Sequence, residues 1–146
     1  MTEYVAVERS VTVPLGVEQA FELFTSGIGS WWPLGTHSAS EKETVGATFE
    51  PEKGGRVFEI DVDGNEADWG EVLEWDPPHR FAMSWQVHVS GAETQWEAVF
   101  TPGEDGTTVT VVHTGWENLG ELAAEAHAGY GPGWEYVLGH YEKEAG

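Results

Sequence analysis

The chain has 146 residues, which suits one domain (1–146) with a core that needs no covalent or metal support. It contains no cysteine, so disulfides, thiolate zinc sites and cysteine nucleophiles are excluded. Six Lys and Arg against 26 Asp and Glu give a net charge of −20, which disfavours nucleic acid and anionic membranes as partners. Neither a signal peptide nor a membrane-spanning apolar run is recognisable, so we expect a cytoplasmic protein.

The first part of the chain predicts one strand followed by two short helices. Residues 4–13 are rich in β-branched side chains and partly alternate, which predicts a strand that ends before Pro14. Residues 17–24 place apolar side chains at the spacing of one helix face. A second short helix is predicted over 28–32, where Pro33 ends it.

The middle of the chain predicts a series of strands, and the end predicts a helix. The strands are expected at 44–50, 56–62, 66–75, 80–88, 94–101 and 107–114. Short turns separate them, which favours an antiparallel meander. From Asn118 onward apolar residues recur at helical spacing, with a kink or restart expected at Pro132. The strand 4–13 is expected at a sheet edge, where it could recruit a second copy into a homodimer.

This order of elements predicts an α+β fold of the helix-grip type. A curved antiparallel sheet of about seven strands would surround a long C-terminal helix, with two short helices after the first strand. Strong sheet twist opens a space between sheet and helix, which becomes a pocket unless large side chains fill it. Eight tryptophans are more than a small core needs, and a pocket wall would use them.

Two positions are candidates for catalysis. His113 lies near the end of a predicted strand, and an inward imidazole could bind a ligand or move a proton; the alternative is a structural histidine. Glu59 could act as an acid or base if it faces the pocket. Its apolar neighbours would then point the other way, so the alternative is a solvated face.

The candidate ligand contacts are mostly aromatic and come from strands, loop and helix. His37 follows the second short helix, in a loop expected near the pocket mouth, where it contacts ligand or caps the loop. The full set comprises Trp32, His37, Trp69, Phe81, Met83, Trp85, Trp96, His113, Trp134, Leu138 and Tyr141. The same aromatic stripes would form a core if the pocket were filled.

Metal and cofactor binding are not expected. The histidines at 37, 79, 88, 113, 127 and 140 include no closely spaced pair of the kind that binds metal. The sequence has no Gly-x-Ser-x-Gly nucleophile motif and no phosphate-binding glycine pattern after a strand.

Motifs distributed over nearly the whole chain resemble one known superfamily. They are Val17-Glu18-Gln19-Ala20-Phe21, Gly29-Ser30-Trp31-Trp32-Pro33, Gly54-Gly55-Arg56, the stretch 69–78 with Arg80-Phe81, the stretch 106–111, His113-Thr114-Gly115-Trp116 and Gly133-Trp134. They are similar to the SRPBCC/START-like superfamily (the Bet v allergen-like fold), and within it to the bacterial branch of heat-shock-protein-90 ATPase activator homologues. The resemblance implies a helix-grip fold. It leaves the activity open, because the superfamily includes ligand carriers, polyketide cyclases and co-chaperone domains.

Three functions follow as hypotheses. The first is binding of a small apolar or aromatic molecule in an internal cavity. The second is a protein-interaction module of the co-chaperone type. The third is a cyclase- or hydrolase-like enzyme that uses a cavity histidine. A measured cavity with its lining residues would discriminate best among them.

Overall fold

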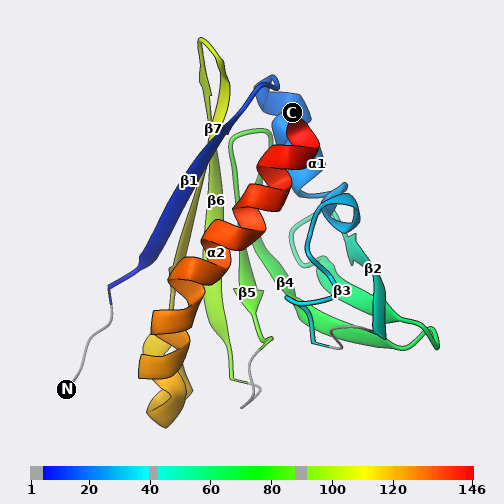
Figure 1. Ribbon diagram of the computed structural model, residues 1–146, viewed down its shortest axis with the longest axis vertical. Coiled ribbons are helices and arrows are strands. Elements are labelled where there is room, and N and C mark those ends of the chain that lie inside the picture. Colours follow the sequence, from blue (N-terminus) through cyan, green and yellow to red (C-terminus); the bar gives the residue numbers. More distant parts are fainter. Residues whose placement is uncertain (1–4, 40–42, 88–91) are drawn as a thin grey trace.

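The computed structural model describes residues 5–39, 43–87 and 92–146 (Figure 1). Two residues of the predicted strands, Tyr4 and His88, lie outside these ranges. The strands are β1 (Val7–Val13), β2 (Thr44–Phe49), β3 (Arg56–Asp61), β4 (Glu66–Asp76), β5 (Arg80–Trp85), β6 (Thr94–Gly103) and β7 (Gly106–Thr114). The helices are α1 (Val17–Phe24), α2 (Ala123–Ala145) and the short 3-10 helices η1 (Ile28–Ser30) and η3 (Trp116–Leu122).

The described strands form one antiparallel sheet in the order β1-β7-β6-β5-β4-β3-β2. Figure 1 shows α2 crossing one face of this curved sheet, with α1 and η1 near its C-terminal end. The predicted helix-grip architecture is therefore confirmed. Strand β1 lies at an edge of the sheet, as predicted, while the homodimer stays a prediction.

The C-terminal helix differs from the prediction in two respects. It begins at Ala123 rather than near Asn118, because Gly120, within η3, adopts a φ of 58° and interrupts the helical turns before α2. The helix then continues through Pro132, so the expected restart there does not occur. Proline removes the hydrogen bond to the carbonyl of residue 128, and Ala128 is exposed, so water can satisfy that oxygen.

Helix α1 fills one half of the space between the sheet and α2. The Phe24 ring lies 5.8 Å from that of Phe81 on the sheet and 5.0 Å from that of Tyr141 on α2. The Phe21 ring packs 5.0 Å from that of Phe100. These aromatic side chains close the interior beside α1, and among the described residues an open space lies towards the other end of α2.

Candidate functional site

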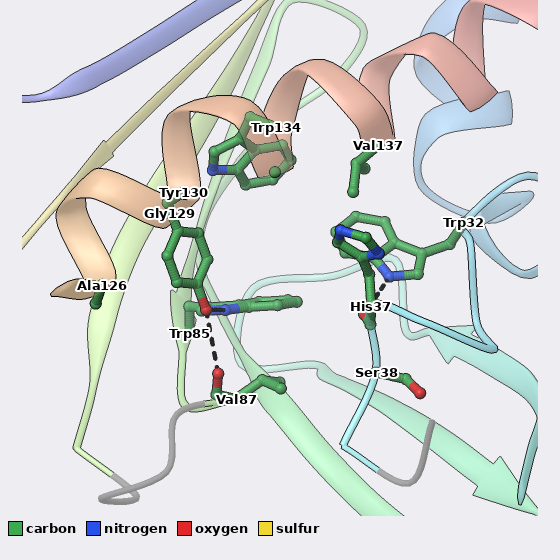
Figure 2. Close-up of a pocket in the computed structure, with 11 residues that line it drawn as sticks. Trp32, His37, Ser38, Trp85, Val87, Ala126, Gly129, Tyr130, Trp134 and Val137 are labelled. Carbon is green, nitrogen blue, oxygen red and sulfur yellow. Dashed lines mark hydrogen bonds between the residues drawn. The ribbon is translucent and has the colours of Figure 1, made fainter. Parts of the chain in front are cut away.

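A cavity of about 280 Å³ lies between the sheet, the loop after η1 and the middle of α2 (Figure 2). This volume is near the lower end of the range of small-molecule sites. The residues that line it are mostly apolar or aromatic: Trp32, His37, Ser38, Trp85, Val87, Ala126, Gly129, Tyr130, Gly133, Trp134 and Val137. The predicted pocket between sheet and helix therefore exists.

Two tryptophans form the main walls. Figure 2 shows Trp85, from the end of β5, and Trp134, from α2, on opposite sides of the open space. Trp32 closes a third side, with its ring 5.7 Å from that of Trp85 and 5.9 Å from that of Trp134. Flat π-systems on three sides favour a planar aromatic guest, which can stack or make edge contacts with each ring.

Tyr130 of α2 is hydrogen-bonded to the end of β5 and the residues after it, at one end of the cavity. Its hydroxyl accepts a hydrogen bond from Nε1 of Trp85 (2.9 Å) and donates one to the carbonyl of Val87 (3.1 Å). Burial raises the pKa of Tyr130 to about 12. The phenol is therefore neutral at pH 7 and acts as a fixed connection rather than as an acid or base.

His37 is the titratable group in the wall with the best geometry for proton transfer. It is half-buried, and its ring stacks on that of Tyr136 at 4.8 Å. Burial, followed by the nearby charge of His140, lowers the pKa of His37 below its usual value of 6.5. The imidazole is therefore neutral at pH 7, as a general base must be.

The hydrogen bonds around His37 indicate its tautomer. The Thr36 hydroxyl lies 3.4 Å from the carbonyl of Pro33, to which it can only donate. Its oxygen is then free to accept from Nδ1–H of His37 at 2.8 Å. This leaves the lone pair on Nε2, which has no hydrogen-bond partner among the described residues.

The predicted contact residues divide into two groups. Trp32, His37, Trp85 and Trp134 line the cavity. The others do not line it and are fully or almost fully buried in the core: Trp69, Phe81, Met83, Trp96, His113, Leu138 and Tyr141. Period-two alternation on the strands and helical spacing on α2 showed correctly that these side chains point inward, but α1 covers much of the inner face of the sheet.

The contacts that the prediction lacked come mainly from α2. Ala126, Gly129, Tyr130, Gly133 and Val137 share the helix face that bears Trp134. Their spacing of three and four residues carries the signal. Gly129 and Gly133 lie in this face without a side chain, so a search for apolar residues at helical spacing does not detect them.

His113 is buried within a hydrogen-bonded cluster behind the cavity wall. Nε1 of Trp134 donates to its Nδ1 at 3.0 Å, and its Nε2 lies 2.6 Å from the Thr94 hydroxyl. An indole N–H can only donate, so Nδ1 accepts and the ring proton resides on Nε2. The geometry corresponds to the structural alternative for His113, in which the imidazole fixes the orientation of Trp134.

We expect His113→Ala to destabilise the protein by about 1–3 kcal/mol, because it leaves the buried N–H of Trp134 without its acceptor. Chemical denaturation of both proteins measures this difference. The His127→Ala variant is the control, since that half-buried imidazole bonds the backbone carbonyl of Val5 rather than the N–H of a buried tryptophan. An unchanged unfolding free energy for His113→Ala, combined with weaker ligand binding, would instead assign the imidazole a direct functional role.

Glu59 is 1% exposed, so the solvated alternative is wrong. Within β3, Val57 and Glu59 point to the core side and Phe58 to the other face, as regular alternation requires. The register shift against β4 leaves Trp69 of β4 as the extra residue. Phe58 points to the outer side, where Cζ of the Arg56 guanidinium lies 4.2 Å from the centroid of the Phe58 ring. Glu59 lies inside, next to Trp69, but does not line the cavity.

Neither a metal site nor a membrane-spanning helix is found in the described part of the chain. No three or more His, Asp or Glu side chains in ranges 5–39, 43–87 and 92–146 are grouped to hold a metal ion. Within the same ranges, no helix is long and apolar enough to cross a membrane.

The curved sheet, the gripping helix and the aromatic cavity define a protein of the SRPBCC/START-like class. Residues 15–143 match the family described as "Activator of Hsp90 ATPase homolog 1-like protein". The chain belongs to this family.

Two solved structures share substantial sequence with the chain. Txn09, described as an anthrahydroquino-γ-pyrone synthase and solved as a complex, is 40% identical over 87% of this chain and 88% of its own, with a TM-score of 0.61. CalC from Micromonospora echinospora, described as a self-sacrificing resistance protein, is 27% identical over 97% of this chain and 94% of its own, with a TM-score of 0.72.

A third structure shows the fold alone. A Bacillus halodurans protein is 17% identical over all of both chains, with a TM-score of 0.71. Among curated proteins, no significant match is found.

Proposed function

We propose that the protein binds a planar aromatic molecule of the polyketide type in its cavity and closes an oxygen-containing ring on it. The observation that carries this proposal is the cavity itself, in which three indole walls face a space bordered by one neutral imidazole, His37. The 40% identity to a protein described as an anthrahydroquino-γ-pyrone synthase supports the same class of substrate.

The reaction forms a C–O bond and releases water without a change of oxidation state, so the protein has to supply only proton transfers. A γ-pyrone fused to an aromatic ring forms when a phenol adds to the far carbonyl of a β-diketone and water is lost. Nε2 of His37 would take the phenol proton while the new C–O bond forms, and would return it to the resulting alkoxide. It would then move a proton from the carbon between the carbonyls to the departing hydroxide.

The aromatic walls contribute by positioning the substrate. Trp85 and Trp134 on opposite sides of the cavity restrict a flat substrate to one plane (Figure 2). Holding the phenol and the diketone arm in a near-attack geometry lowers the entropic part of the barrier. The apolar lining also excludes water, which favours the loss of water from the intermediate.

The test uses ortho-hydroxydibenzoylmethane, whose ring closure gives flavone, a γ-pyrone. We expect the protein to accelerate flavone formation, followed by absorbance and chromatography. Since a lowered pKa keeps His37 neutral above pH 6.5, the rate should be constant there and fall as pH drops through that lowered pKa. Saturable binding of substrate without any acceleration would refute ring closure and leave ligand binding alone.

A further inference from the structure

The loop that carries His37 is attached to the protein interior through one buried carboxyl group. Glu59 accepts hydrogen bonds from the backbone N–H of Ala39 at 2.6 Å, from the Thr44 hydroxyl at 2.9 Å and from Nε1 of Trp69 at 2.6 Å. Its side chain is almost completely buried. Three donors from three separate segments thus meet on one side chain.

These contacts restrain the segment Leu34–Ala39 at both of its ends. At its C-terminal end, Ala39 is bonded to Glu59 directly. The Ser38 hydroxyl, next to Ala39, donates to the carbonyl of Leu34 at the N-terminal end at 2.5 Å and lies 2.8 Å from the Thr44 hydroxyl. His37 lies between these attachments, so its position depends on them.

A second connection reaches His37 through the cavity wall. Nε1 of Trp32 donates to the backbone carbonyl of His37 at 2.7 Å. The ring of Trp32 packs 5.0 Å from that of Trp69, whose own N–H is held by Glu59. Glu59 therefore orients both the loop and Trp32, the wall residue that is hydrogen-bonded to the loop.

We propose that Glu59 is a positioning residue that holds the His37 imidazole at the edge of the cavity. It acts through Ala39, Thr44 and Trp69 and does not touch the ligand. This inference rests on the role of His37 in the proposed function. It assigns the buried carboxyl group a purpose, since a buried polar network that is fully satisfied rigidifies its surroundings.

Two substitutions separate this role from simple core packing. In Glu59→Gln the amide oxygen still accepts from Ala39 and Trp69, and the amide nitrogen donates to Thr44. The Thr44 hydroxyl can then reverse and donate to Ser38, while Ser38 still donates to the carbonyl of Leu34, which preserves every contact. Glu59→Leu keeps a similar volume but removes all the acceptors.

The first readout is the pKa of His37, followed by NMR through its imidazole resonances. In Glu59→Leu the released loop exposes the imidazole, so its pKa should rise toward the usual 6.5, while Glu59→Gln leaves it unchanged. Thr44→Val removes the hydroxyl contacts to Glu59 and Ser38 but keeps the bond from Ala39 to Glu59, so it should produce a smaller rise in the same direction. If Glu59→Leu does not fold, the pKa of His37 in Thr44→Val decides whether the proposal holds. An unchanged pKa of His37 in the folded variants would overturn the proposal.

The second readout is flavone formation. A shift of about 1 Å in a catalytic group can cost about 10²-fold in rate, so Glu59→Leu should lower kcat by that order with a smaller change in KM. Glu59→Gln should restore kcat to nearly the wild-type value. Equal losses in both variants would contradict positioning by hydrogen bonds. Absence of flavone formation in the wild-type protein would refute the proposed function alone, since the NMR titration still tests the position of His37.

Discussion

Replacing His37 with alanine is expected to lower the rate of flavone formation by about 10²–10⁴-fold, the usual contribution of a general base. Binding of the substrate should change little, because the walls formed by Trp85 and Trp134 remain. The loss should therefore appear in kcat rather than in KM, measured by steady-state kinetics over a range of substrate concentrations.

The matched control is His79→Ala, because that imidazole is exposed and does not line the cavity. It should keep the wild-type rate. His37→Ala should remain within about 1 kcal/mol of wild-type stability, since the ring is only half-buried. Full activity of a folded His37→Ala protein would exclude this histidine as the base.

The second large effect is expected for Trp85→Ala, which removes one wall of the cavity and the hydrogen bond to Tyr130. We expect a stability loss of about 3–5 kcal/mol, since the space left by a buried indole collapses only in part. Binding of emodin, a planar anthraquinone, should weaken at least about tenfold for lack of the stacking surface. Denaturant unfolding and quenching of tryptophan emission by emodin measure the two effects.

Trp75→Ala separates loss of the wall from general destabilisation. This half-buried indole packs on Phe21 and Phe49 beside α1, with ring centroids at 5.1 and 5.8 Å, and does not line the cavity. The variant should lose stability yet bind emodin like the wild-type protein. Equal weakening of emodin binding by both substitutions would show that the walls are not specific contacts. If no aromatic ligand changes the tryptophan emission, binding of a protein partner becomes the favoured function.

Local sequence signals predicted most of the fold. Alternating residues and short turns marked the strands, and helical spacing marked α1 and α2, because these patterns depend on which side chains an element buries. The limits of α2 were wrong at its start, where a glycine with positive φ interrupts the helical turns. Continuation through Pro132 depended on the exposure of residue 128, which no local pattern contains.

The composition of the cavity was only partly predictable. Inward-facing residues such as Trp85, Phe81 and Trp96 have the same alternation, yet only Trp85 lines the cavity. The difference arises because Phe24 of α1 packs against Phe81 and Trp96 and occupies the space beside them. This packing joins segments far apart in the chain, so neither strand reveals it.

The sequence by itself determined a helix-grip fold, a net charge of −20 and an interior rich in tryptophan, because composition and periodicity decide which faces are buried. Only the tertiary structure decided the roles of the polar residues. His113 and Glu59 are both inward, yet each is surrounded by donors and acceptors of other segments, whereas His37 borders open space. Whether a buried polar group is held or available depends on its partners in space, and those partners come from loops and strands that the fold alone brings together.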